Sequence, residues 1–410
     1  MEKNEKIGSF PDHSQNFWHL ASIQASSAGI PVMIVGGHIV KNHGIITGIT
    51  SVILGNLMLW IIGITIISMS VPKKDNALQN IMQYLGKPGS ISGAIFLILA
   101  FLSWYTLQLD SANIAISSLL FDNHISLRFG AAFGAFIALL SIGGIKLIKR
   151  YCIFIFPFII IFAVFSSIFY FKLIQTPFVW SFSITGIFAV ISINLAGMVN
   201  LPTFFRHSRS LGDSFLGLSL TVVFTMFFQI YMILIGYHST SDISSNNLVY
   251  SYLLSLFIVL CTISVNLVNI YFALAGWEMI FPHQKTSKEF VIVGLLGTLA
   301  YTFIQITTTM KFILNMAENF IMSLGIVLLL SFLTKTFEQH RPRSYERAIN
   351  FSCWFFGAIV GTLYTWRVNI SSPKTLIVSF IATTLAYLFI IYIEEVTWSA
   401  RKVFIERKHE

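Results

Sequence analysis

Charged residues are scarce in this chain of 410 residues: Asp, Glu, Lys and Arg make up 10% of it, whereas hydrophobic residues make up 55%. A soluble domain carries roughly 25% charged residues, so these few charges cannot cover a water-facing surface of this size. The mean hydropathy is +0.77, and the 39 Phe residues add apolar surface that has no polar group to satisfy. The composition therefore excludes an ordinary soluble protein and indicates that lipid is the main solvent.

Cysteines and catalytic motifs are also few. Cys152, Cys261 and Cys353 all lie in or beside apolar runs, and no two of them have the spacing of a metal site or a redox pair. We interpret them as small packing residues. The sequence shows no nucleophile–base pair, Walker-type loop or HExxH-type spacing. We expect neither an enzyme nor an organic cofactor.

The net charge is +9, which in a soluble protein would suggest a nucleic-acid partner. Here the basic residues lie in short loops between apolar runs, where they orient a chain in the membrane. The expected partners are the lipid bilayer and a small-molecule substrate, without nucleic acid, and the expected state is a monomer.

Long apolar runs dominate the sequence. A spanning helix needs about 20 mainly apolar residues, and twelve runs qualify, with short linkers that leave no room for a soluble module. The polar stretch Met1–Asn16 precedes a run that suits a retained helix, so we expect no cleaved signal peptide. The predicted spans are 17–39, 44–71, 91–120, 129–145, 151–173, 178–205, 214–238, 247–277, 290–310, 312–334, 351–368 and 374–395.

The basic residues predict the orientation. With the N-terminus inside, 20 of the 26 Lys and Arg residues fall in inside segments and 6 in outside segments. This bias predicts a multi-pass protein of the cell (inner) membrane with both termini in the cytoplasm.

Two spans are interrupted by helix-weakening residues. The first contains Ser26, Ser27, Gly29, Pro31, Gly36 and Gly37, and the sixth contains Asn194, Gly197, Asn200 and Pro202. Broken helices five spans apart suggest a five-plus-five inverted repeat with a binding site at the breaks, although packing glycines explain such residues in many membrane helices. The predicted fold is all-α and integral to the membrane, with two extra C-terminal helices. The predicted segments are 1–16 (cytoplasmic), 17–173 (first repeat), 178–334 (second repeat), 335–395 (loop and two helices) and 396–410 (basic tail).

Polar residues inside apolar spans are costly and often face a cavity or a partner. Here they fall on spans one, three, six, eight and ten, which are expected to line the cavity of such a carrier. The alternative is that these side chains only bond helices together. The candidates are Gln24, Trp104, Gln108, Asp110, Asn194, Asn200, Ser264, Asn266, Asn269 and Glu318.

Trp104 and Gln108 are four residues apart and share a helical face. A ring for stacking and an amide for in-plane hydrogen bonds suit a flat, polar solute. Asp110 and Glu318 are candidates for a proton or cation role. Ser264 offers an oxygen to sodium, or a bond back to its own helix.

At these residues the chain resembles the nucleobase–cation symporter family, which includes the cytosine permeases and the bacterial hydantoin carrier. Asn200-Leu-Pro-Thr-Phe-Phe-Arg206 is similar to the family's Asn-Ile-Pro-Asp-Phe-Thr-Arg. Ser103-Trp104-Tyr-Thr-Leu-Gln108 is similar to Gly-Trp-Phe-Gly-x-Gln, and Trp18 to Gln24 to the hydantoin carrier's Trp-x5-Gln. Gly36-Gly37, Gly55-Asn56, Asn266 and Asn269 also match by position.

The resemblance implies alternating access and symport with sodium or protons. Carried over by position, Trp104 would stack on the substrate, and Gln108, Gln24 and Asn269 would bond it. Carbonyls near Ile23 and a hydroxyl near Ser264 would hold sodium.

The chain departs from the family at three places. Asn194 replaces the second stacking aromatic, Thr203 replaces the motif's Asp, and the tenth span reads Leu330-Ser331-Phe332 where Asp-Tyr is usual. Loss of one stacking face costs about 1–3 kcal/mol by analogy with base–aromatic contacts. The substrate therefore need not be cytosine.

The sequence thus predicts a cation-coupled importer of a nucleobase or related planar heterocycle. Two alternatives stay open: a symporter of the same fold for an amino acid, amine or vitamin precursor, and a channel or receptor on the same scaffold. An amino acid could bind its carboxylate at a helix break without Trp104.

Overall fold

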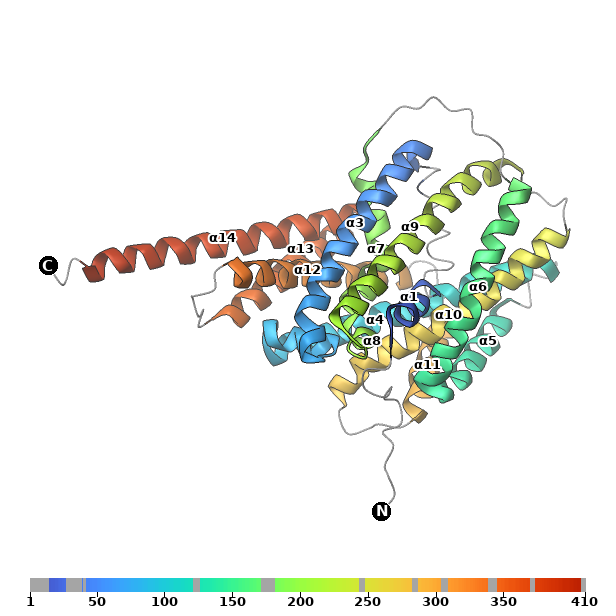
Figure 1. Cartoon of the computed structure of the whole chain (residues 1–410), viewed down its shortest axis with the longest axis horizontal. Coiled ribbons are helices and arrows are strands. Elements are labelled where there is room, and N and C mark those ends of the chain that lie inside the picture. Colours follow the sequence, from blue (N-terminus) through green and yellow to red (C-terminus); the bar gives the residue numbers. More distant parts are fainter. Residues whose placement is uncertain are drawn as a thin grey trace, which may run out of the picture.

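The computed structural model describes residues 15–26, 39, 42–120, 126–170, 181–242, 248–281, 287–303, 309–337, 345–368 and 373–406. Over these ranges the chain is almost wholly helical (Figure 1). The described residues contain no named strand, only one isolated parallel bridge between Gln15 and Ser208. The expected all-α fold is confirmed.

Each of the twelve predicted spans corresponds to a helix, and the sixth corresponds to two. Two single 3-10 turns join neighbouring helices: η1 (Val71–Lys73) and η2 (Ser141–Gly143). The helices are α1 (Phe17–Ser26), α3 (Ile45–Ser70), α4 (Ala77–Leu120), α5 (Ser126–Leu140), α6 (Gly144–Tyr170), α7 (Ile184–Val199), α8 (Pro202–Phe205), α9 (Leu211–Asp242), α10 (Leu248–Ile280), α11 (Ser287–Phe303), α12 (Thr309–Phe337), α13 (Glu346–Val368) and α14 (Pro373–Glu406).

Nine stretches of the described residues are long and apolar enough to cross a membrane, and one of them, Arg128–Phe162, includes most of α5 and most of α6. The described part of α1 has 10 residues and that of α11 has 17. Each of these two helices adjoins residues outside the described ranges. The predicted break of the first span, with Gly29, Pro31 and the Gly36–Gly37 pair, lies outside the described residues.

α4 begins earlier than the third predicted span. Its first segment, up to Leu85, occupies much of the stretch between the second and third predicted spans, and Gly86 then turns the chain with φ 74 and ψ −178. Glycine accepts this positive φ without a Cβ clash. Pro88 follows in the first turn of the next segment, where a missing N–H leaves no helical bond unmade.

The sixth span is interrupted later than its polar residues suggest. α7 runs unbroken through Asn194 and Gly197, and the chain leaves the helix at Asn200 (φ −93, ψ 5) before α8 starts at Pro202. The predicted interruption of the sixth span is therefore present, at Asn200 and Pro202, whereas Asn194 and Gly197 lie inside α7. At this turn the Thr203 N–H donates to the Asn200 carbonyl at 3.0 Å, and the Thr203 hydroxyl donates to Asn200 Oδ1 at 2.6 Å.

The main helix pairs are preserved when each helix of the first five spans is exchanged for the helix five spans later. α1 packs on α9 and α6, and correspondingly α7 packs on α3 and α12. The contact of α6 with α10 corresponds to that of α12 with α4. Three further contacts join a helix to its own counterpart, and they are α3–α9, α4–α10 and α5–α11. This pairing supports the two-repeat arrangement, whose boundaries stay a prediction.

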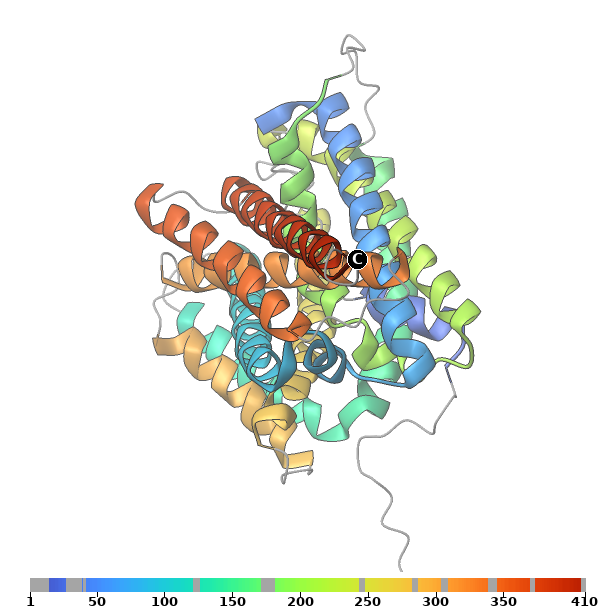
Figure 2. The same ribbon diagram turned by 90° about the vertical axis from the view of Figure 1, so that its left-hand side faces the viewer.

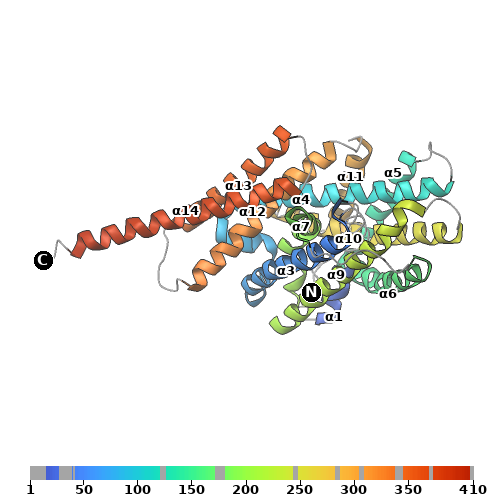
Figure 3. The ribbon, with the colours of Figure 1, turned by 90° about the horizontal axis from the view of Figure 1, so that it is seen from above.

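The last two helices pack beside α12, at the end of the molecule opposite α5, α6 and α11 (Figure 3). Asn319 of α12 donates to the Thr365 hydroxyl of α13 at 3.1 Å and accepts from the Ser379 hydroxyl of α14 at 3.1 Å. A Cβ added to Gly361 would clash with Ser379, so glycine allows the two helices to approach closely. α14 extends well beyond its neighbours (Figures 1 and 3), and Figure 2 shows this helix nearly end-on.

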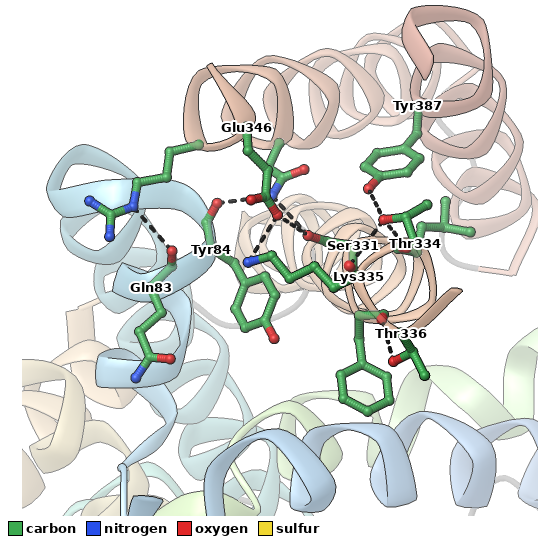
Figure 4. Close-up of polar contacts among 12 residues, drawn as sticks. Gln83, Tyr84, Ser331, Thr334, Lys335, Thr336, Glu346 and Tyr387 are labelled. Carbon is green, nitrogen blue, oxygen red and sulfur yellow. Dashed lines mark hydrogen bonds and ion pairs between the residues drawn. The ribbon is translucent and has the colours of Figure 1, made fainter. Parts of the chain in front are cut away.

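A polar cluster joins the first segment of α4 to α12 and α13 (Figure 4). Lys335 Nζ lies 2.9 Å from Glu346 Oε1 and 4.2 Å from the centre of the Tyr84 ring. The Ser331 hydroxyl donates to the same carboxylate at 3.1 Å, and Arg347 Nε donates to the Gln83 carbonyl at 3.2 Å. The cluster fixes one end of α12 against the Gly86 turn.

Large apolar side chains are exposed on the outer faces of the helices, as a lipid-facing surface requires. Examples come from four different helices: Leu57, Phe154, Leu216 and Phe389.

Candidate substrate and cation sites

A cavity of about 60 Å³ lies among α1, α4, α7, α9 and α10. One water needs roughly 10–15 Å³ measured in this way, so the cavity has room for several waters or one small ring. Its lining is mostly apolar, with a few amides and hydroxyls. The lining residues are Gln24, Phe101, Trp104, Ile193, Asn194, Ala196, Gly197, Met198, Thr221, Thr225, Val265, Val268, Asn269 and Phe272.

Helices α4 and α10 form the aromatic wall of the cavity. They run antiparallel, because Phe101 faces Phe272 (ring centroids 4.8 Å apart) while Tyr105, further along α4, meets Asn266, earlier on α10. Trp104 and Asn269 each lie about one turn from that ring pair and on the same side. An aromatic face and an amide edge therefore meet on one wall.

Helix α7 contributes the facing groups. Asn194 Nδ2 is buried and has no hydrogen-bond partner among the described residues. A Cβ built on Gly197 would meet nothing within 4 Å, because this position opens onto the cavity. The missing side chain of Gly197 adds to the volume of the cavity.

The cavity thus brings together Gln24, Trp104, Asn194 and Asn269, four of the five predicted substrate residues. The fifth, Gln108, is buried one turn beyond Trp104 on α4 but does not line the cavity. Asp110 is half-buried further along α4 and close enough to Tyr301 of α11 to act on it electrostatically.

Three helices meet at the predicted cation residues. The Ser264 hydroxyl of α10 donates to the Ser26 carbonyl of α1 at 3.3 Å, and the Ser26 hydroxyl donates to the Ile23 carbonyl at 2.9 Å. From α6, Cys152 Sγ lies 3.6 Å from Ser264 Oγ. These serine and carbonyl oxygens suit a hard cation such as sodium, whereas the neutral thiol is a poor ligand for it.

Asn266 does not join that cluster. Its Nδ2 donates to the Tyr105 carbonyl at 3.3 Å, and its Oδ1 accepts from Asn269 Nδ2 at 3.3 Å. It therefore supports the substrate wall of the cavity.

Glu318 is buried on α12 and takes part in none of the hydrogen bonds or ion pairs found among the described residues. It shares a helical face with Gly325, seven residues on, whose nearest neighbours are Val199 and Leu195 of α7 and Ile62 of α3. Neither α3 nor α7 carries an ionisable residue. No metal-binding group of His, Cys, Asp and Glu exists in the described ranges.

Sequence reasoning missed several lining residues. Phe101 and Phe272 read as ordinary lipid or core residues in a chain with 39 Phe, and only the pairing of α4 with α10 selects them. Thr221 and Thr225 are four residues apart on the seventh span, a polar spacing that could have marked a cavity face. Cys152 was interpreted as packing, and only the fold places it beside Ser264.

No protein-family model matches the chain, and no curated protein matches its sequence. Solved structures do match. Mhp1, described as a nucleobase-cation-symport-1 family transporter, in a closed conformation with bromovinylhydantoin bound, has a TM-score of 0.69 at 17% identity, over 98% of this chain and 96% of that one. Its inward-facing conformation has a TM-score of 0.65 at 13% identity, over 96% of each chain.

Two other transporters have the same fold. A manganese transporter of Eremococcus coleocola has a TM-score of 0.63 at 12% identity, over 95% of this chain and 97% of that one. A Na⁺-coupled sialic acid symporter has a TM-score of 0.62 at 12% identity, over 91% and 88%. The chain therefore has the fold of these transporters and is a multi-pass membrane protein, and the predicted resemblance is confirmed at the level of the fold.

Proposed function

We propose that this protein is a secondary active transporter that imports a nucleobase or a related planar heterocycle by cation symport. The observation that carries the proposal is the cavity, where Trp104, Phe101 and Phe272 supply aromatic surface and Gln24, Asn194 and Asn269 supply amides. The similar folds of solved transporters support transport as the activity.

The charge of the cavity favours a neutral solute. None of its lining residues carries a formal charge. A charged solute leaving water would need an opposite charge or many dipoles to offset its desolvation, whereas a neutral heterocycle needs only stacking and a few amide contacts. This favours a heterocycle over an amine or amino acid, although a carboxylate at the first-span break stays an alternative.

Sodium is the coupling ion that the oxygens favour. The Ile23 and Ser26 carbonyls and the Ser264 and Ser26 hydroxyls converge where α1 meets α10, and Na⁺ prefers such hard ligands. One of the similar folds is described as Na⁺-coupled. Protons are the alternative, through Glu318 or Asp110.

Transport would proceed by alternating access, for which one similar carrier is known in closed and inward-facing forms. The predicted location is the cell (inner) membrane with both termini cytoplasmic, as a monomer.

Uptake by purified protein in liposomes tests the proposal. Radiolabelled uracil, cytosine, hypoxanthine and hydantoin are offered with an inward sodium gradient, an inward proton gradient or neither. We expect one compound to accumulate only with a gradient. Trp104→Ala should abolish its uptake, whereas Trp366→Ala, at a 75% exposed site on α13, should leave it unchanged.

Two outcomes would contradict the proposal. Steady ion current without solute flux would indicate a channel. Uptake of an amino acid that survives Trp104→Ala would favour the alternative symporter.

A further inference from the structure

Asn266 is a buried bridge between the backbone of α4 and a side chain of the cavity. Its Nδ2 donates to the Tyr105 carbonyl at 3.3 Å, while its Oδ1 accepts from Asn269 Nδ2, also at 3.3 Å. Asn266 has no exposed surface, and Asn269 is 7% exposed and lines the cavity.

The chemistry of the bridge fixes which way each amide points. A backbone carbonyl only accepts, and its second lone pair is available beside the helical bond. Asn266 must therefore turn its NH₂ group to Tyr105 and its oxygen to Asn269. Asn269 can meet that oxygen only with its own NH₂ group, so its Oδ1 is left over. No hydrogen bond among the described residues uses Asn269 Oδ1.

The anchor of the bridge is rigid. Tyr105 is fully buried, its hydroxyl donates to the Gly134 carbonyl of α5 at 2.8 Å, and it lies 3.1 Å from the Thr298 hydroxyl of α11. A Cβ on Gly276 would come within 3.1 Å of the Ala94 carbonyl, so α4 and α10 are in close contact below the cavity. The orientation of Asn269 is thus set by four packed helices.

We infer that Asn266 is a positioning residue that makes Asn269 present an acceptor, so the substrate must offer a ring N–H at this point. On α7, the unpartnered Asn194 Nδ2 can donate to a carbonyl. Together they select a heterocycle with a lactam or imide edge, N–H beside C=O, and disfavour one alkylated at that nitrogen. The inference rests on the proposed function and specifies its substrate class.

Binding of methylated ligand pairs to the purified full-length protein in sodium buffer tests this inference. The probes are uracil and hydantoin, each compared with its singly N-methylated forms, by calorimetric titration. We expect methylation at one ring nitrogen to weaken binding by roughly 10- to 100-fold, because a buried acceptor loses its partner. Methylation at the other nitrogen should have a smaller effect.

The same ratio identifies the role of Asn266. Asn266→Leu and Asn266→Ser remove the bridge, so the ratio between parent and methylated ligand should fall to within about threefold of one. If Asn266 had only a structural role, its replacement would lower the affinity for both ligands by the same factor, and the ratio would not change. Asn269→Asp retains an acceptor and should keep it, whereas Asn269→Ala should lose it.

Asn350 provides a matched control. It too is a buried asparagine whose Nδ2 donates to a carbonyl of α4, that of Tyr84, at 3.0 Å. Asn350→Leu removes an equivalent bridge far from the cavity and should leave the ratio unchanged.

The outcomes separate this inference from the proposed function. Binding of parent and methylated ligands with equal affinity by the unaltered protein would overturn the acceptor assignment and leave the carrier standing, even if no Asn266 variant folds. An undiminished ratio in a folded Asn266 variant would overturn the positioning role. If none of the heterocycles tested in uptake or titration binds the unaltered protein, the proposed function fails and the substrate class with it.

Discussion

Cys152 Sγ of α6 lies 3.6 Å from Ser264 Oγ of α10, so a thiol stands beside the oxygens proposed to hold sodium. A neutral sulfur is a soft, weak partner for a hard cation. The Cys152 sulfur, a poor sodium ligand, thus lies next to four oxygens that suit sodium: the Ile23 and Ser26 carbonyls and the Ser26 and Ser264 hydroxyls.

Replacing that sulfur with oxygen should therefore strengthen cation binding. We expect Cys152→Ser to raise sodium affinity by roughly tenfold, about 1.4 kcal/mol, and Ser264→Ala to lower it. The measurement is the sodium concentration that half-saturates ligand binding. Cys152→Ala is the control, since it removes the thiol without adding a ligand, and an equal gain in that variant would argue against oxygen coordination.

The empty space at Gly197 predicts a variant that fills the cavity without disturbing the fold. Gly197→Val should weaken heterocycle binding at least tenfold, because its methyl groups project where a Cβ meets nothing within 4 Å. Thermal stability should not fall. In contrast, a Cβ on Gly294 would lie 2.7 Å from that of Ala138, so Gly294→Ala should destabilise the protein by about 1–3 kcal/mol.

If Gly197→Val binds ligand normally, the substrate does not occupy this cavity. Titration of both variants with the same heterocycle, after size-exclusion chromatography confirms a folded protein, makes the comparison.

Glu318 predicts how to recognise proton coupling. Glu318→Gln removes no hydrogen bond or ion pair found among the described residues, so the melting temperature should not decrease. If this carboxyl carries the coupled proton, the variant should lose uptake driven by a pH gradient but retain exchange of labelled for unlabelled substrate. Asp110→Asn is the parallel variant, and uptake unaffected by either change would leave sodium as the driving ion.

The Lys335–Glu346 pair should contribute little to stability. Its side chains are 46% and 23% exposed, and ion pairs in contact with water contribute about 0–1 kcal/mol. Glu346→Gln should therefore lower the melting temperature by only a few degrees, and less in high salt. Asn350→Leu at the same cluster breaks two buried bonds of 3.0 Å and should cost more.

Sequence reasoning located the spans because a hydrocarbon core imposes a length that apolar runs reveal directly. It located the break of the sixth span only approximately. Gly197 and Asn194 resemble helix breakers locally, but their positions are determined by a cavity that forms between distant helices, and Asn200 makes the actual turn. Helix propensity alone does not distinguish a glycine or asparagine that lines a cavity from an asparagine at which the helix ends.

The candidate site shows the same limit. Trp104 and Asn269 could be selected as costly polar groups in lipid, and both line the cavity. Gln108 satisfied the same criterion but lies one turn too far along α4. The sequence does not single out Phe101, Phe272 or Cys152, because burying an aromatic ring or a thiol in an apolar helix costs little free energy. Their placement depends on the register between α4, α6 and α10.

α14 has a practical consequence for imaging this 46.2 kDa protein. Its 34 residues form a rod roughly 50 Å long at about 1.5 Å per residue, whereas the hydrocarbon layer is about 30 Å thick. The terminal turns would therefore emerge from the bilayer as a stiff continuation of a membrane helix. A helical partner fused in register at Glu406 would inherit that orientation and provide an alignment marker for electron cryomicroscopy.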